Sequence, residues 1–453
     1  MSTYSMRAGD AATRLGVKQA TLYAYVSRGV LSRRRMLDGR GSLFDPDEVE
    51  RLALRGRPRR PAGAADIVVE SQITEITADR LYYRGLDVID LARTRTFEDV
   101  AELLWTGVLP SVSAGPQAAK PAAMESGGSA AQGAWQATLA AITSASAAQA
   151  ALPPGTLPLE RLQVIVPAMA ATDPLRLHLD PVAIVAAARS IIAGMVDCLP
   201  RIAPAALPAD GTPAPAGTAT PAGTATPAGT VATAAAAGAD AIAPRLWACL
   251  CERRPAPAML RAVSAALVLL ADHELAASTL AARAAASVRA DPYAVVATGL
   301  GAVGGALHGG SSLGAETLLA AAHGPADVPR VVGELLRRGE KVPGFGHFVY
   351  KAGDPRAIAL LELVRRAAPK SAQLAIADAV LDEVKRKSLP EPNIDFALAT
   401  LARVAGMVRG SGEAIFAVAR TAGWVAHALE AYTTAPLRPR AVYTGPVPDG
   451  AIT

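Results

Sequence analysis

Apolar residues recur at helical spacing through two long segments of this chain, 260–275 and 357–366, and each keeps them on one face. Alanine is abundant, whereas runs rich in β-branched or aromatic residues are scarce, and this composition favours helices over strands. Half of the 453 residues are hydrophobic (51%), which is enough for a large core. The sequence therefore predicts a mainly α protein of two or three domains.

One segment departs from the helical spacing. Residues 71–85 alternate between apolar and polar side chains and end in Tyr83-Arg84-Gly85. Alternation with a period of two is typical of strands rather than helices. We expect a small sheet or an extended lead-in at this point.

The first 56 residues read as a small unit of their own. A short helical pattern at 8–15 is broken by Gly16-Val17, and a second pattern at 18–28 ends before Gly29, where a helix C-cap belongs. Asp38-Gly39 between two short extended runs is a strong hairpin signal, and Asp45-Pro46 begins another helix. This order resembles the winged helix-turn-helix of MerR-type regulators and excisionases.

Positive charge is concentrated in this unit. Residues 1–60 contain 13 Lys and Arg but only 6 Asp and Glu, in a chain whose net charge is +5. Such a surplus is the electrostatic footprint of a polyanion partner, although it can also be a solvated face. As DNA-binding candidates along the second helix and the hairpin we select Lys18, Arg28, Arg33, Arg34, Arg35 and Arg40. The alternative is a domain that only mediates protein contacts.

Three stretches predict linkers or insertions instead of folded elements. Residues 57–67 form a basic linker rich in Pro and Arg. Residues 112–133 and 203–238 are low-complexity, and the second contains near-identical repeats such as Pro215-Ala216-Gly217-Thr218. Pro and Gly every few residues block both helix and sheet, so we expect disordered surface insertions.

The cysteines and the N-terminus bear on localisation. Cys198, Cys249 and Cys251 are an odd number without the spacing of a metal site, which predicts buried or free thiols in a reducing compartment. The chain opens with a charged stretch, and no apolar run reaches membrane-spanning length. We therefore expect a cytoplasmic protein without a metal.

A histidine between close glycines is the strongest chemical signal. His347 lies in the segment 342–356, with Gly344 and Gly346 just before it and Arg356 nine residues after it. The glycines allow the backbone to turn tightly and to approach a ligand. An imidazole can polarise a carbonyl group, and a guanidinium can hold a carboxylate with two parallel hydrogen bonds. This segment suits the binding of a small oxo acid.

Three more residues stand in unusual settings. His273 lies in Asp272-His273-Glu274-Leu275, His308 is followed by Gly309-Gly310, and Asp395 precedes an apolar helical pattern. Singly, each has an ordinary structural explanation: a satisfied histidine within a helix for His273, close backbone packing for His308 and an N-cap for Asp395. Their order along the chain is what carries a functional interpretation.

In order, the motifs resemble those of the citrate synthase family over about residues 68–453. They are Y-R-G at 83–85, D-H-E-L-x-A-S-T from 272, D-P-Y-A from 291, L-H-G-G from 307, P-G-F-G-H-x-V-Y-K from 343, D-P-R from 354, N-I-D-F from 393 and A-R-T-A-G-W from 419. The resemblance implies a large helical domain, 68–305 with 406–453, and a smaller one, 306–405, that closes over CoA. It also implies a homodimer.

The resemblance assigns roles to matching positions. In the family, Asp395 would remove a methyl proton from acetyl-CoA, His308 would hydrogen-bond the thioester oxygen, and His347 would polarise the keto group of oxaloacetate. Oxaloacetate would be held by His273, His347, Arg356, Arg420 and Arg438, the last reaching the partner subunit's site. CoA would lie against Val342, Pro343, Gly344, Phe345 and Gly346, with Asn393 nearby. No cofactor beyond the co-substrate acetyl-CoA is implied.

Two motif positions differ from the family pattern, and one further run only looks like a dinucleotide-binding motif. Ala276 stands where the family commonly has an asparagine that touches oxaloacetate, and the loss of one hydrogen bond is worth about 0.5–1.5 kcal/mol. Ser311-Ser312 replace the usual Ala-Asn after the glycines. The run 299–304 is literally G-x-G-x-x-G, but no strand precedes it and no acidic residue follows at the distance a dinucleotide site needs.

The motifs therefore predict an acyltransferase of the citrate synthase type, which condenses acetyl-CoA with oxaloacetate and hydrolyses citryl-CoA. Two alternatives stay open. One is a 2-methylcitrate synthase that uses propionyl-CoA, since one methylene changes affinity by only about 1–3 kcal/mol. The other is a DNA-binding regulator whose enzyme-like body senses a metabolite.

Overall fold

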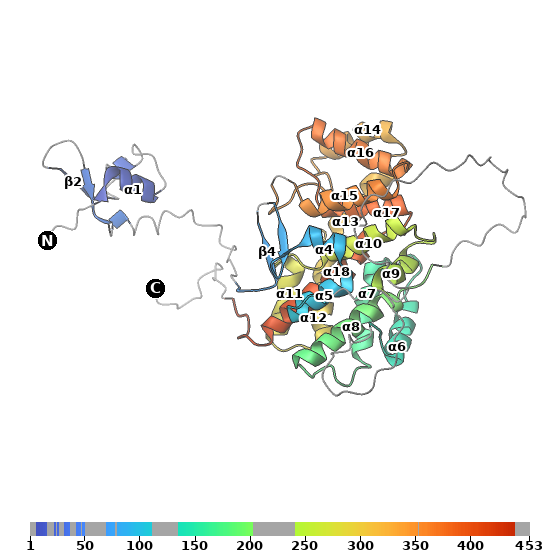
Figure 1. Cartoon of the computed structure of the whole chain (residues 1–453). Helices are drawn as coiled ribbons and strands as arrows, with labels where there is room; N and C mark the ends of the chain where they lie inside the picture. The colour runs from blue at the N-terminus through green and yellow to red at the C-terminus, as the bar shows by residue number, and fades with distance from the viewer. Residues whose placement is uncertain are drawn as a thin grey trace, which may run out of the picture. The chain divides into compact units, whose positions relative to one another are not determined.

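The computed structural model describes residues 6–15, 22–23, 25–26, 31–36, 42–46, 48–49, 69–77, 79–110, 135–202, 241–351 and 353–439. The chain divides into two compact units, residues 1–69 with 438–453 and residues 70–437 (Figure 1). The predicted linker, 57–67, and the predicted insertions, 112–133 and 203–238, lie outside the described residues.

The N-terminal unit has the predicted winged arrangement. The strands β1 (Met6–Arg7), β3 (Ser42–Phe44) and β2 (Arg33–Arg35) form an antiparallel sheet in that order, and α1 (Ala8–Leu15) follows β1. A small apolar core joins the elements, since the following side chains are buried: Ala11, Ala12, Leu22, Leu31, Phe44 and Val49. The predicted first helix and the β2–β3 hairpin are both confirmed.

The larger unit is predominantly helical, as predicted, with one small sheet. Its antiparallel strands are β4 (Thr74–Ile76), β5 (Leu81–Tyr83) and β6 (Leu86–Asp87), so the alternating segment does form a sheet. The helices are α4 (Val88–Thr94), α5 (Phe97–Thr106), α6 (Leu139–Ala150), α7 (Pro158–Ala170), α8 (Pro181–Asp197), α9 (Ile242–Leu250), α10 (Pro257–Leu270), α11 (Ala277–Ser287), α12 (Pro292–Val303), α13 (Gly310–Ala321), α14 (Val328–Arg337), α15 (Pro355–Ala367), α16 (Ala372–Arg386), α17 (Ile394–Ala405) and α18 (Ser411–Ala431), with the 3₁₀ turn η1 (Pro325–Asp327) before α14.

Helix α18 runs through the middle of this unit and is buried along nearly its whole length (Figure 1). It packs against α5, α7, α8, α10, α11, α12, α13 and α17. At the crossing with α12, a Cβ atom at Gly299 would lie 2.6 Å from the ring of Trp424. One glycine of the G-x-G-x-x-G run therefore serves close helix packing. Within the described ranges, no helix combines the length and apolarity that a membrane span requires.

Helix α10 is shorter than the periodicity predicts, because it ends at Leu270 and not near residue 275. The buried side chain of Asp272 accepts hydrogen bonds from Thr74 Oγ1 at 2.6 Å and from the backbone N–H of Glu274 at 3.0 Å. Its own backbone N–H donates to the Tyr83 hydroxyl at 3.0 Å. These bonds hold 271–276 as a turn against the sheet, so placing His273 within a helix was wrong.

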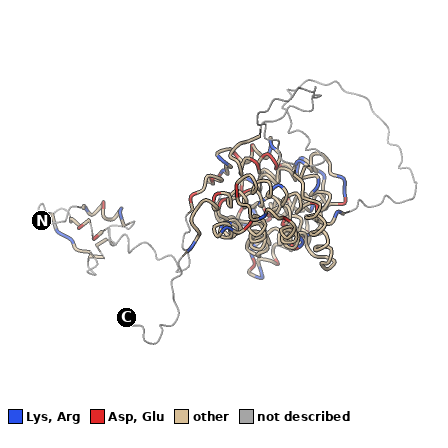
Figure 2. The backbone as a smooth tube through the Cα atoms, turned by 90° about the horizontal axis from the view of Figure 1, so that it is seen from below, with Lys and Arg blue, Asp and Glu red and all other residues tan. Residues whose placement is uncertain are grey.

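Charges of both signs are interspersed over the helical unit (Figure 2). Cys198, Cys249 and Cys251 are free thiols and are buried, as the sequence predicts. Among the described residues, no group of three or more His, Cys, Asp or Glu side chains is arranged to hold a metal ion.

Candidate active site

One cavity, of about 370 Å³, gathers side chains from six separate parts of the larger unit. Its walls come from β4, the turn after α10, the loop before α13, the loop before α15 with the first turn of that helix, the first turn of α17, and the N-terminal half of α18. The lining residues are Ile76, His273, Glu274, Leu275, Ala276, His308, His347, Phe348, Val349, Arg356, Ile394, Asp395, Phe416 and Arg420. The predicted residues His273, His308, His347, Arg356, Asp395 and Arg420 therefore share one cavity.

His347 has a fixed tautomer. Its Nδ1 atom accepts the backbone N–H groups of Val349 at 3.0 Å and Tyr350 at 3.2 Å. In a neutral imidazole the other nitrogen then carries the proton, so Nε2 is a donor. Burial, together with the nearby Arg356 charge, lowers the pKa of His347 to about 4. The ring is therefore neutral near pH 7 and can donate to a ligand oxygen.

His308 is oriented by Ser278. Its Nε2 atom lies 2.7 Å from Ser278 Oγ, and the same oxygen accepts the indole N–H of Trp424 at 3.3 Å. With that lone pair occupied, the Ser278 hydroxyl proton is available to His308 Nε2, which favours the tautomer with a proton on Nδ1. Burial lowers the pKa of His308 to about 4. A second neutral imidazole therefore lines the cavity.

His273 lies beside His347, with their ring centroids 5.3 Å apart. Its Nε2 atom is 3.1 Å from the hydroxyl of Tyr350. Burial first, and then the charges of Arg356 and Arg420, hold the pKa of His273 well below its usual range. All three histidines of the cavity are therefore uncharged near neutral pH.

Asp395 lies in the first turn of α17 and is not its N-cap. The cap is Asn393, whose Oδ1 accepts the backbone N–H groups of Asp395 at 3.0 Å and Phe396 at 3.4 Å. Burial raises the pKa of Asp395 to about 6, although a hydrogen bond from Ser311 and the Arg356 charge act in the opposite direction. A carboxylate with a raised pKa is a stronger base than an exposed one.

The two cavity arginines differ in their partners. Arg356 donates from Nε at 3.0 Å and from Nη2 at 2.8 Å to Asp354, whose carboxylate also accepts the backbone N–H of Ile394. Arg420 donates from Nε to Leu270 O at 2.8 Å and stacks over Phe416, and its buried Nη1 has no hydrogen-bond partner in the described part of the chain. Burial lowers the pKa of Arg420 to about 10, so it remains charged and can receive an anion.

The segment expected to hold CoA borders a second, adjoining cavity of about 510 Å³, lined by Val342, Phe345 and Gly346 among others. His347 and Phe348 line both cavities. Pro343, Gly344 and Asn393 do not line it. Instead, Asn393 donates its backbone N–H to Gly344 O and its amide to Gly346 O, both at 2.9 Å.

The remaining predicted residues lie outside the cavity. Arg438 is exposed and does not line it. In the N-terminal unit, Arg33 and Arg34 are exposed on β2, and Arg35 follows them in the same strand. The other DNA-binding candidates, Lys18, Arg28 and Arg40, fall outside the described residues.

Sequence reasoning missed several residues of the site. Those that line the cavity without a predicted role are Ile76, Glu274, Leu275, Phe348, Val349, Ile394 and Phe416. Ser278 and Tyr350, which contact the histidines, stand inside recognised motifs and could have been found there. Ile76 and Phe416 carry no local signal, because only the fold brings β4 and α18 to this cavity.

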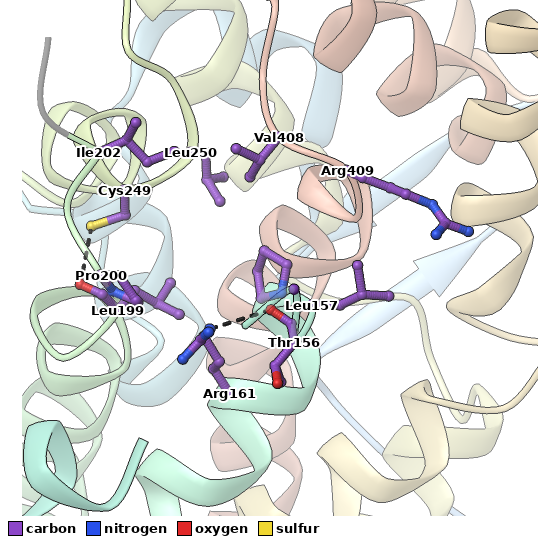
Figure 3. Close-up of a pocket in the computed structure, with 12 residues that line it drawn as sticks. Thr156, Leu157, Arg161, Leu199, Pro200, Ile202, Cys249, Leu250, Val408 and Arg409 are labelled. Carbon is purple, nitrogen blue, oxygen red and sulfur yellow. Dashed lines mark hydrogen bonds between the residues drawn. The ribbon is translucent and has the colours of Figure 1, made fainter. Parts of the chain in front are cut away.

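A separate cavity of about 370 Å³ lies between α7, the end of α8, the end of α9 and the α17–α18 loop (Figure 3). Its walls are largely apolar, and Arg161 beside it donates to the carbonyl of Thr156 at 3.3 Å. None of its lining residues is a histidine, Asp or Glu. It therefore lacks the acid–base groups that distinguish the cavity around His347.

The fold and site define a helical protein whose cavity combines neutral histidines, a buried carboxylate and arginines. Residues 63–440 match the family model for citrate synthase, C-terminal domain, and residues 6–56 match that for the MerR HTH family regulatory protein. The chain belongs to the citrate synthase family and carries an N-terminal MerR-type helix-turn-helix domain.

Individual relatives agree with this. Citrate synthase 2 of Bacillus subtilis is 40% identical over 200 residues, which are 42% of this chain and 53% of that protein. Putative citrate synthase 2 of Mycobacterium tuberculosis is 38% identical over 203 residues, 44% of this chain and 54% of that protein. The chain thus spans about half the length of the curated relatives it matches.

Solved structures share the fold. Citrate synthase from Thermoplasma acidophilum, in a ternary complex with carboxymethyl coenzyme A and oxaloacetate, superposes with a TM-score of 0.62 at 22% identity, covering 86% of this chain and 97% of that one. Citrate synthase from Pyrobaculum aerophilum superposes with a TM-score of 0.60 at 26% identity, covering 86% and 93%.

Proposed function

We propose that this chain condenses an acyl-CoA, in the first place acetyl-CoA, with oxaloacetate and hydrolyses the resulting citryl-CoA to citrate and CoA. The observation that carries the proposal is the shared cavity of Asp395, His308 and His347, which brings a buried carboxylate and two neutral imidazoles to one space. The solved complex with carboxymethyl coenzyme A and oxaloacetate in a relative of the same fold supports this substrate pair.

The first step would be carbon-acid chemistry. Asp395 takes a proton from the methyl group of the thioester, while His308 donates a hydrogen bond to the thioester oxygen as it becomes an enolate. Abstracting so weakly acidic a proton needs the base and the donor to act together. The raised pKa of Asp395 and the lowered pKa of His308 both favour this division of roles.

The second step would be carbon–carbon bond formation. The Nε2–H group of His347 donates to the keto oxygen of oxaloacetate while the enolate carbon attacks the keto carbon. The keto oxygen becomes an alkoxide, which His347 protonates to the hydroxyl group of citryl-CoA. Arg420 Nη1, which no other described residue contacts through a hydrogen bond, can donate to a substrate carboxylate. Arg356 can bind a substrate only through the part of its guanidinium group that does not donate to Asp354, because Nε and Nη2 are already used. The segment 306–405 would move as the smaller domain that closes over CoA.

The test is CoA release from acetyl-CoA and oxaloacetate by the wild type and by Asp395→Ala, with propionyl-CoA as a parallel substrate. We expect a loss of at least about 100-fold in the variant, the usual scale of a general base. Equal release from both proteins would refute the proposed mechanism. The ratio of acetyl-CoA to propionyl-CoA turnover decides between a citrate and a 2-methylcitrate synthase.

We propose DNA binding as a second function, located in the N-terminal unit. Arg33 and Arg34 are exposed on β2 of a winged fold, where guanidinium groups can reach phosphates. A gel shift with duplex DNA over a range of salt concentrations tests this. Binding that weakens steeply with salt supports contacts to phosphates, and absent or salt-independent binding would refute them.

We also propose a homodimer in which Arg438 completes the partner's site. The proposal follows from the family assignment and from the exposure of the Arg438 side chain. An isologous pair of subunits would exchange this arginine reciprocally.

A further inference from the structure

The reaction cavity adjoins a further cavity, of about 470 Å³, which shares no lining residue with the proposed CoA groove. The two share the lining residues Ile76 and Glu274. The adjoining cavity is mostly polar, and its other lining residues are Ser71, Gln72, Ile73, Thr74, Glu75, Arg84 and Gly85. Among the described residues, Glu274 is thus the only ionisable group that lines both spaces. A polar space of this size can hold several waters.

The backbone of Glu274 is held in an unusual conformation. Its φ of 54° is in the left-handed region, which costs a residue with a Cβ atom about 1–2 kcal/mol. The bond from its N–H to the buried Asp272 carboxylate, at 3.0 Å, fixes this turn. Strain of this kind is tolerated where the surroundings over-determine it, and it clusters at functional sites. The turn directs Glu274 to the junction of the two cavities.

The acid–base groups of the reaction cavity are few. Among its lining residues only Asp395 and Glu274 carry carboxylates. The Nδ1 atom of His347 is occupied by two backbone N–H groups, and the Nε2 atoms of His273 and His308 are each within hydrogen-bond distance of a hydroxyl. The side chain of Glu274, by contrast, makes no hydrogen bond or ion pair with any residue of the described part of the chain.

The proposed reaction contains two proton abstractions, one from carbon and one from water. Asp395 is protonated after it has taken the proton from carbon, so the abstraction of a proton from water is best served by another base. We propose that Glu274 is the general base of thioester hydrolysis, acting on a water from the polar cavity; this rests on the proposed function. Its carboxylate takes one proton of the water, and the oxygen bonds to the thioester carbon. The C–S bond then breaks, and the CoA thiolate leaves and receives that proton from Glu274.

Citryl-CoA supplied directly tests the role of Glu274, because the protein can either hydrolyse it to citrate and CoA or cleave it back to acetyl-CoA and oxaloacetate. In Glu274→Gln we expect hydrolysis to fall at least about 100-fold, the scale of a missing general base, while cleavage stays within about threefold. Glu274→Asp should recover part of the hydrolysis. The matched control is Glu75→Gln, which alters the polar cavity without touching the reaction cavity.

Three results would overturn the inference. They are unchanged hydrolysis in Glu274→Gln, hydrolysis and cleavage that fall together in Glu274→Gln and Glu274→Asp, and an equal loss of hydrolysis in Glu75→Gln. A wild-type protein that neither hydrolyses nor cleaves citryl-CoA would instead refute the proposed function, and the inference with it.

Discussion

The carboxylate of Asp354 joins Arg356 through two hydrogen bonds, at 3.0 Å to Nε and 2.8 Å to Nη2, and both side chains are almost completely buried. The same carboxylate accepts the N–H of Ile394 at 3.1 Å, one residue before Asp395. Arg356 is therefore oriented by the protein and not by a ligand. A single buried carboxylate sets the positions of a predicted substrate arginine and of the helix that carries the predicted base.

The pH dependence of the proposed activity should report on Asp395. Its pKa is raised to about 6 and the base must be ionised, so kcat/KM should fall as the pH drops through about 6. His308 and His347, whose pKa values are lowered to about 4, stay neutral over this range. A pH–rate profile of the wild type measures this acid limb. A flat profile down to about pH 5 would contradict the assignment.

The contribution of Asp395 to stability should depend on pH in the opposite sense to that of a salt-bridged carboxylate, and Asp395→Asn tests this. Because the folded-state pKa of Asp395 is raised, its contribution to stability is present below about pH 4 and is lost as the pH rises through about 6. We therefore expect Asp395→Asn to exceed the wild type by about 1–3 kcal/mol at about pH 8 and to match it near pH 4. Urea denaturation at both pH values checks this, and a variant that is less stable at pH 8 would contradict it.

Much of this arrangement follows from the sequence. The α15 segment, the β2–β3 hairpin and the grouping of three histidines with Asp395 were all expected from local pattern or motif order. The early end of α10 was not, because apolar periodicity cannot register that Asp272 is held by Thr74, which lies 198 positions earlier in the chain. Glu274 was missed for the same reason, since its conformation depends on that long-range bond.

Replacing Ala276 by Asn should affect both stability and specificity. Ala276 is the N-cap of α11, provides no side-chain cap and lines the reaction cavity. Ala276→Asn should stabilise the protein by about 0.5–2 kcal/mol, because its amide can accept an N–H of the first turn. It should also lower the KM for oxaloacetate. Thermal unfolding and steady-state kinetics measure the two effects, and Ala276→Leu is the control that fills space without capping.

Mixing two inactive variants should restore activity if Arg438 completes the partner's site. In heterodimers of Asp395→Asn with Arg438→Ala, one of the two sites contains both intact residues. Random exchange of subunits in a C2 dimer then gives roughly a quarter of the wild-type activity. The CoA-release assay after mixing checks this. Full activity of Arg438→Ala alone, or no recovery on mixing, would argue against a shared site.

Removing both exposed arginines of β2 should weaken the proposed DNA binding through electrostatics alone. For Arg33→Gln with Arg34→Gln we expect the slope of log K against log salt to become shallower by about 0.9 for each phosphate that the protein no longer neutralises. The gel shift measures this slope with duplexes of unrelated sequence. Arg7→Gln, at the edge strand β1, is a control that also removes positive charge from the same sheet. An unchanged slope in the β2 variant would exclude the wing as the DNA-binding surface.

The close fit between Gly344 and Phe396 couples two parts of the proposed reaction mechanically. Gly344 has a φ of 82°, and a Cβ atom there would lie 2.8 Å from Phe396 Cβ, next to Asp395. Hydrogen bonds also link Gly346 to Glu391 and Asn393 to both Gly344 and Gly346. We therefore expect the stretch proposed to receive CoA and the start of α17 to move together. The part of the substrate farthest from the chemistry would then help to aim the base, and a shortened thioester would be turned over slowly even when it is bound.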